Sequence, residues 1–171
     1  KACELDNGTI ALLGDFQSIV YGRDDYRVYT CKDIVCQMLN QNGECQEVQH
    51  IVKSQKSFAN RKINPVLIGL SFTVEQKGND LYLIYTDNIK EGEPLTLSVG
   101  MGVMLAGTCT RMTRISPDGI ESQMLFQNKE IDKLYTGNWH FDGNNIFLIL
   151  QESGGMFSFA DSYITKVSLL K

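Results

Sequence analysis

The chain has 171 residues, of which 43% are hydrophobic and 21% are charged, and its formal net charge is −4 at pH 7. This size and composition predict one globular β-rich domain over residues 1–171. The mild negative charge argues against a nucleic-acid-binding protein, which needs concentrated Lys and Arg. No apolar run approaches the roughly 18 residues of a membrane-spanning helix, so we expect no membrane span.

The first 31 residues predict strands joined by a polar turn. The apolar runs Ile10–Leu13 and Ile19–Tyr21 are followed by Gly22–Asp25, which has the composition of a turn. Apolar and polar residues then alternate over Tyr26–Cys31. Alternation with a period of two indicates an extended strand.

Residues 33–41 allow two interpretations. Asp33 can cap a short helix there, which places four apolar residues on one face: Ile34, Val35, Met38 and Leu39. Alternatively, Asn42-Gly43 forms the two-residue turn of a β-hairpin, in which Cys36 pairs with Gln49. The helical period and the capping residue agree, so the sequence favours the short helix near 33–41.

A hairpin follows Pro65. Residues Leu70–Glu75 alternate, Lys77–Asp80 has turn composition, and Leu81–Tyr85 returns as a strand that is apolar on both faces. A strand of that kind is typical of a central position in a sheet. We therefore expect Leu81–Tyr85 to be covered on both sides.

The longest alternating stretch runs from Leu95 to Ile115. Apolar residues from Leu95 to Leu105 occupy every second position, and the opposite positions carry small residues such as Gly100 and Gly102. The pattern predicts a long strand with one core face. Gly107 interrupts it, so we expect a bend there.

The remaining sequence predicts short strands, tight turns and one helical turn. These segments are a turn at Ser116–Gly119, a strand at Ile120–Phe126, a helical turn within Asn128–Lys133, a hairpin of Tyr135–Phe141 with Ile146–Gln151, and a closing strand at Tyr163–Leu169. Consecutive hairpins favour an antiparallel meander that closes into an up-and-down, lipocalin-like β-barrel. A two-layer β-sandwich is the second possibility.

One short pattern resembles a known family. Gly137 and Trp139 resemble the Gly-x-Trp of lipocalin-like barrels, although the pair lies near the C-terminal end instead of on the first strand. We carry no site residue over from that family.

Cysteine spacing bears on the compartment. The five cysteines are Cys3, Cys31, Cys36, Cys45 and Cys109. Their spacing does not fit the paired C-x2-C units of a zinc site, so we expect no metal. We expect one or two disulfides and, because the chain also starts at Lys1 and not at Met, a secreted or periplasmic protein. Inert buried thiols are the competing interpretation.

Catalytic signatures are sparse. His140 and Asp142 are two residues apart, which on a strand places a possible base and its orienting carboxylate on one face. No nucleophile elbow, phosphate-binding loop or His-Glu-x-x-His accompanies them. We therefore expect no enzymatic activity and no cofactor, and a hydrolase using His140 is the last of three hypotheses.

Two groups of residues favour binding. The connection from Ser153 to Phe159 is flanked by glycines and carries three apolar side chains: Met156, Phe157 and Phe159. Aromatic residues of the predicted strands are able to line a ligand cavity: Tyr82, Tyr85 and Trp139. The first hypothesis is a binding protein that acts on another protein as an inhibitor or accessory subunit. The second is a β-barrel carrier of a small apolar ligand.

Overall fold

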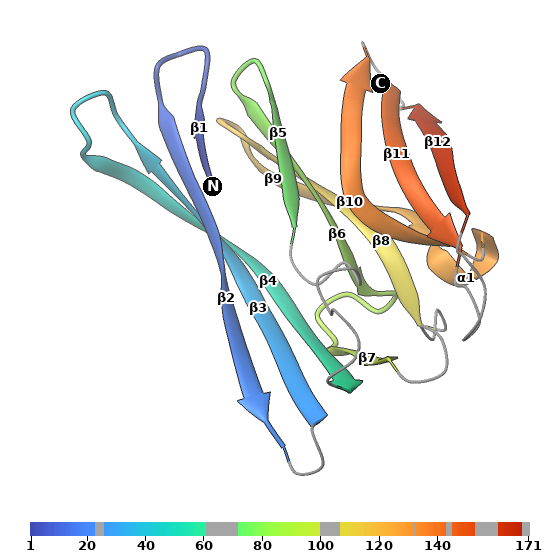
Figure 1. Ribbon diagram of the computed structural model, residues 1–171. Coiled ribbons are helices and arrows are strands. Elements are labelled where there is room, and N and C mark those ends of the chain that lie inside the picture. Colours follow the sequence, from blue (N-terminus) through green and yellow to red (C-terminus); the bar gives the residue numbers. More distant parts are fainter. Residues whose placement is uncertain are drawn as a thin grey trace.

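The computed structural model describes residues 1–22, 26–60, 72–99, 107–131, 133–142, 145–152 and 161–168. The protein is mainly β, and its strands form three sheets (Figure 1). The N-terminal sheet has the order β1 (Ala2–Glu4), β2 (Ile10–Tyr21), β3 (Tyr26–Leu39), β4 (Cys45–Asn60) and β7 (Leu95–Val99). The central sheet has the order β5 (Thr73–Lys77), β6 (Asp80–Asn88), β8 (Thr108–Ser116) and β9 (Gly119–Gln127). The C-terminal sheet contains β10 (Lys133–Asp142), β11 (Asn145–Glu152) and β12 (Ser162–Ser168), and the single helical turn α1 (Asn128–Ile131) precedes it.

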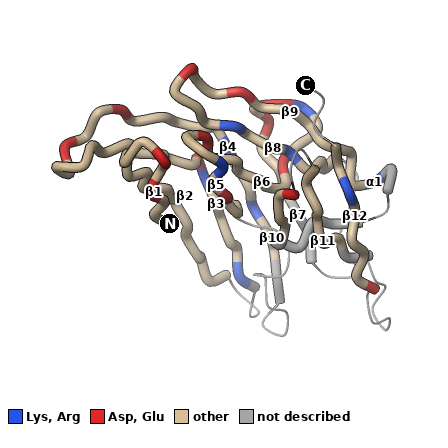
Figure 2. Tube along the Cα trace, turned by 90° about the horizontal axis from the view of Figure 1, so that it is seen from above, with Lys and Arg blue, Asp and Glu red and all other residues tan. Residues whose placement is uncertain are grey.

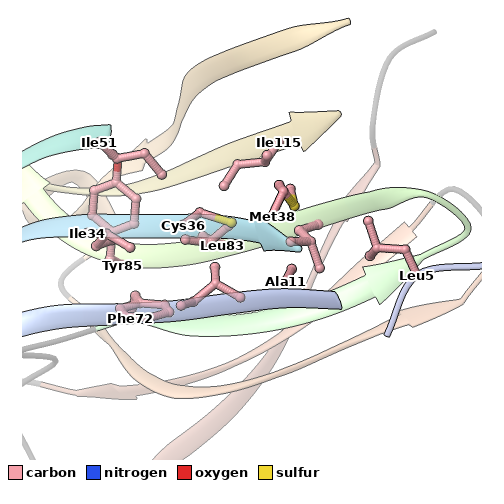
Figure 3. Packing of buried hydrophobic residues seen from close by; sticks show 12 residues of the cluster. Leu5, Ala11, Ile34, Cys36, Met38, Ile51, Phe72, Leu83, Tyr85 and Ile115 are labelled. Carbon is pink, nitrogen blue, oxygen red and sulfur yellow. The ribbon is translucent and has the colours of Figure 1, made fainter. Parts of the chain in front are cut away.

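Strand β6 of the central sheet is covered on both faces. Leu81, Leu83 and Tyr85 of β6 belong to one apolar cluster with residues of the N-terminal sheet, among them Ile34 and Cys36 (Figure 3). On the opposite face of the same strand, Ile84 belongs to a second cluster with residues of the C-terminal sheet: Ile146, Leu148 and Leu150. This arrangement confirms the prediction that the strand with two apolar faces is central.

The prediction that the strands close into one barrel is wrong for the described part of the chain. The strands there form three open sheets that pack in layers, which is closer to the sandwich alternative. A barrel has one interior, whereas the apolar residues of β6 alternate between two cores and need cover on both sides. The meander is also interrupted, because β7 pairs with β4 in parallel.

The prediction of a short helix near 33–41 is wrong, because this segment continues strand β3. Ile34, Cys36 and Met38 point into the core at every second position, so burial selects the period of a strand. Cys36 pairs with Gln49, as the hairpin alternative predicted.

The loop of that hairpin is one residue longer than the two-residue turn of the sequence-based alternative. The N–H of Asn40 donates to the carbonyl of Glu44 at 2.9 Å, which leaves three residues between them. Gly43 has φ of +81°, the conformation that a three-residue hairpin loop requires at its last position. Glycine at this position therefore explains the loop length.

Leu95 to Ile115 does not form one bent strand. β7 lies in the N-terminal sheet and β8 in the central sheet, and residues 100–106 between them lie outside the described residues. Gly107 precedes β8 with φ of +80°, and its carbonyl accepts the N–H of Ile89 at 3.0 Å. Leu95 is buried, as its predicted core position requires. The pattern thus identified extended segments but not their separation into two sheets.

The other hairpins are confirmed. β5 pairs with β6, β8 with β9, and β10 with β11, all antiparallel, and the closing strand is β12. The helical turn expected after β9 is α1. Local turn chemistry was therefore sufficient to place these elements.

Candidate protein-binding face

Strand β4 has an inverted distribution of polar and apolar side chains. Its polar residues point inward and are buried: Gln49, Lys53, Gln55 and Ser57. Of its apolar residues, Ile51 points inward and is 6% exposed, whereas three point outward to solvent: Val48 at 60% exposure, Val52 at 63% and Phe58 at 37%. Since a strand with one solvated face normally shows the opposite arrangement, β4 needs a physical explanation.

Part of the inward face is satisfied by charge pairing and hydrogen bonds. The ammonium Nζ of Lys53 lies 3.1 Å from Oδ2 of Asp15 on β2, and the two side chains are only 0% and 6% exposed. The side-chain amide of Gln55 donates to the carbonyl of Thr86 on β6. These contacts join the N-terminal sheet to the central sheet through polar groups.

Other polar atoms of this interior have no hydrogen-bond partner among the described residues. Oε1 of Gln49, Oε1 of Gln55, Oγ of Ser57 and Oγ1 of Thr86 are buried without a hydrogen bond. A buried polar atom without a partner destabilises a fold by about 1–3 kcal/mol. The unpaired polar atoms on the inward face of β4 therefore lower the stability of the fold.

The outward face of the N-terminal sheet carries a group of exposed apolar side chains that we call the outer patch. It consists of Leu12, Phe16, Val35, Val48 and Val52. The register places Leu12 and Val48 on either side of Gln37, and it places Val35 between Gly14 and His50. The side of Gly14 is open, since a Cβ added there would meet no atom within 4 Å. Neighbouring exposed apolar residues of this kind mark interaction surfaces.

Basic groups border the outer patch. Lys32 and Lys56 are exposed on the same face. Nε2 of His50 lies 3.1 Å from Oδ2 of Asp33, so this carboxylate next to the patch is already paired. Acidic positions lie at several hairpin tips (Figure 2), and exposed Glu44 and Glu47 lie beside Val48 at the β3–β4 hairpin. The patch is therefore apolar, with lysines toward its Val52 end and glutamates at its Val48 end.

The aromatic residues proposed to line a ligand cavity are divided between the two cores. Tyr82 and Trp139 both contact Phe141, with ring centroids 4.7 Å and 5.1 Å apart. Tyr85 points to the other face of β6, where its hydroxyl lies 2.9 Å from Oγ1 of Thr113. Burial raises the pKa of the Tyr85 phenol. Because β6 separates these residues, they do not line one common space.

The apolar tip Met156, Phe157 and Phe159 lies outside the described residues. Nothing in the structure tests its predicted role in binding.

His140 is oriented by a carboxylate that the sequence did not indicate. Its Nδ1 lies 3.1 Å from Oε1 of Glu75 on β5, and Oε2 of Glu75 accepts the N–H of Phe141 at 3.1 Å. Asp142, the expected partner, instead lies at the end of β10 and pairs in register with Asn145. The His140 side chain is 77% exposed. The pair joins strands of two sheets, so no spacing in the sequence could have revealed it.

All five cysteine thiols are unpaired, so the predicted disulfides were wrong. A disulfide needs Cα atoms about 4.4–6.8 Å apart, which adjacent strands provide only at directly opposed positions. The register opposes Cys36 to Leu13 and Gln49, and it opposes Cys109 to Asp87 and Gln127. Burial raises the pKa of the Cys36 thiol to about 11 and also raises the pKa values of Cys31 and Cys109. The thiols other than Cys3 and exposed Cys45 are buried, as in the competing interpretation.

A polar pocket of about 320 Å³ lies between two hairpin turns. Its lining consists of Asn7, Gly8, Thr9, Asn40, Gln41, Asn42 and Gln46. This lining has no apolar or charged side chain and does not suit the apolar ligand of the carrier hypothesis.

No family model, curated protein or solved structure matches the chain. Across the described ranges, no helix is long and apolar enough to cross a bilayer, and no group of three or more His, Cys, Asp or Glu side chains is placed to hold a metal ion.

The sequence did not point to the outer patch. Its signal is the alternation of Val48 and Val52 with Gln49 and Lys53, which indicates a strand. Alternation alone does not say which set faces solvent, because that depends on where the next sheet packs.

Proposed function

We propose that this protein is a non-enzymatic binding protein that docks on another protein through the outer patch and acts as an inhibitor or accessory subunit. The observation that carries the proposal is the inverted strand β4, on which Val48 and Val52 are exposed while Lys53 and Gln55 are buried. Contact with a partner would remove the apolar side chains from water, which stabilises the complex by about 25 cal/mol for each Å² buried.

The border of the patch specifies the chemistry of the partner. Lys32 and Lys56 flank the apolar side chains, and Asp33 is paired with His50. A partner with an apolar surface and carboxylates placed opposite Lys32 and Lys56 is complementary to this arrangement. Charges at the rim of an interface act mainly on the association rate, so binding through this face should slow at high salt.

The test compares partner capture from the native source by three forms of the protein. Val52→Asp places a carboxylate in the outer patch, and Ile164→Asp places one at an apolar position on β12 that is exposed at 75%, compared with 63% for Val52. We expect the wild type and the Ile164→Asp variant to capture the same partner protein, and we expect the Val52→Asp variant not to capture it. Binding of the same partners by Val52→Asp and the wild type would reject the outer patch as the docking surface.

A second measurement uses the captured partner once it is purified. Hydrogen exchange of the complex should show slower exchange over residues 48–52 than in the free protein, with no change over β12. Protection confined to the C-terminal sheet would contradict the proposal.

The cellular compartment of the protein remains a prediction. The expectation of a secreted or periplasmic protein depended in part on disulfides, and the unpaired thiols give it no support. The carrier and the His140 hydrolase also stay predictions, since no observation above favours either.

A further inference from the structure

Strand β2 has a free edge. β1 covers only its beginning, since Ala2, Cys3 and Glu4 pair with Leu12, Ala11 and Ile10. The last contact is between Lys1 and Leu13, which exchange two backbone hydrogen bonds of 2.6 and 2.8 Å. Among the described residues, no strand pairs with this edge from Gly14 to Tyr21.

The free edge presents a regular series of backbone donors and acceptors. Both the N–H and the C=O of Leu13 point toward β1, because both bond to Lys1. In an antiparallel strand every second residue points its N–H and C=O to the same side. The register with β3 shifts between Asp15 and Gln17, but the extra residue lies on β3, where Lys32 and Asp33 together oppose Phe16, so the alternation of β2 continues. Asp15, Ile19 and Tyr21 therefore direct these groups to the free edge, whereas Val20 directs them to β3.

The side chains of this edge lack the usual protection against pairing. The segment from Phe16 to Tyr21 reads Phe-Gln-Ser-Ile-Val-Tyr and contains no charge, proline or glycine. Four of its side chains are large, apolar and exposed: Phe16, Ile19, Val20 and Tyr21. Natural edge strands normally avoid association through lysine, proline, a bulge or a short length. A segment without charge or proline and with high β-propensity pairs readily with an identical one.

We propose that two copies of this chain associate through their β2 edges, in antiparallel pairing about a two-fold axis next to Ser18. In this register, Gln17 of one copy opposes Ile19 of the other, and Phe16 opposes Val20. The N-terminal sheets of both copies join into one continuous sheet.

Charge favours a second copy as the occupant. Asp15 is the one charged residue of β2, and its carboxylate is bound to Lys53 on the inward side and only 6% exposed. Self-pairing therefore places no free like charges opposite each other, which is the usual penalty of pairing identical strands. The assembly also stops at a dimer, because each copy has one β2 edge and a two-fold interface uses the edges of both copies.

The first test is a cross-link. Ser18 would face its counterpart as a non-hydrogen-bonded pair, with Cα atoms about 4.5 Å apart, which is within the range of a disulfide. In a Cys45→Ser background, Ser18→Cys should form a disulfide dimer at least about tenfold faster than Ser162→Cys, because paired thiols have an effective concentration in the millimolar range. Ser162 is an exposed serine on β12, the edge strand of the C-terminal sheet, and serves as the matched control. Equal rates for the two variants would overturn the proposal.

The second test needs no substitution. Amide exchange of Ile19 should slow as the protein concentration rises through the dissociation constant, while the amide of Val20 should be protected at every concentration. Sedimentation equilibrium should show a dimer over the same range, and Ile19→Pro should return it to a monomer, since proline is tolerated where the N–H points away from the sheet. A monomer at all concentrations, or open-ended assembly instead of a dimer, would reject the two-fold pairing. This inference does not depend on the proposed function, because Val52→Asp should leave the dimer intact.

Discussion

Lys53 and Asp15 form an ion pair inside the protein, with Nζ and Oδ2 3.1 Å apart and the ammonium side chain 0% exposed. The pair lies on the inward face of the N-terminal sheet, next to hydrogen-bonding groups that have no partner. Removing two charges from water is expensive, and their attraction repays the expense only in part. The pair therefore compensates for the burial of Lys53 and adds little net stability.

This view predicts different outcomes for single and double substitutions. Lys53→Met leaves the Asp15 carboxylate enclosed without a counter-charge and should lower the free energy of unfolding by about 3–5 kcal/mol. The double variant Lys53→Met with Asp15→Leu should regain most of that loss, because apolar replacements of similar volume are often neutral. Urea denaturation of both variants and the wild type measures the difference. If the single variant is as stable as the wild type, the pair is solvated.

The orientation of β4 is testable with two neighbouring residues. Ile51 is 6% exposed and Val52 is 63% exposed. Ile51→Ala should reduce the free energy of unfolding by about 2–5 kcal/mol, whereas Val52→Ala should change it by less than about 0.5 kcal/mol. Thermal or urea unfolding checks both values. The reverse order would mean that the strand is shifted by one residue, which moves every side chain to the opposite face.

The buried thiol of Cys36 predicts a loss of stability at alkaline pH. Burial raises its pKa from 9.0 to about 11, so the folded protein holds this proton to higher pH than the unfolded chain does. The resulting stabilisation is complete below pH 9 and decreases as the pH rises toward 11, by about 3 kcal/mol at most. Cys36→Ala should show a smaller decrease between these values than the wild type, as measured by urea unfolding. Cys45→Ala, which alters an exposed thiol, should retain the wild-type profile.

The only tryptophan reports on packing between the central and C-terminal sheets. The indole N–H of Trp139 donates to Oγ1 of Thr73 at 2.7 Å. Thr73→Val removes this acceptor and should lower the free energy of unfolding by about 1 kcal/mol and change the fluorescence of the native protein. Thr73→Ser keeps the hydroxyl and should preserve the emission. Identical spectra for all three proteins would show that the indole bonds elsewhere.

Local patterns predicted the central sheet well. The apolar run from Leu81 to Tyr85 and the turns at residues 78–79 and 117–118 define the hairpins without reference to the rest of the chain. They also predicted that β6 is covered on both sides, because a strand with two apolar faces has no stable alternative. Short-range physics was sufficient there.

The N-terminal sheet depended on contacts that the sequence does not display. Ile34, Val35, Met38 and Leu39 fit a helical face as well as a strand, and burial against β6 decided between them. The parallel pairing of Gln55 with Leu95 joins segments that are far apart in the chain. The same limitation hid the outer patch, since the exposure of Val52 is known only after the central sheet is placed.

The order in which the chain visits its sheets restricts how the protein can be divided. After β4 the chain leaves the N-terminal sheet, forms the β5–β6 hairpin of the central sheet, returns to add β7 beside β4, and leaves again for β8 (Figure 1). Any cut that isolates the N-terminal sheet removes either β7 or the hairpin that covers its core. We therefore expect these two sheets to unfold together, so a test of the proposed protein contact requires the intact chain instead of excised fragments.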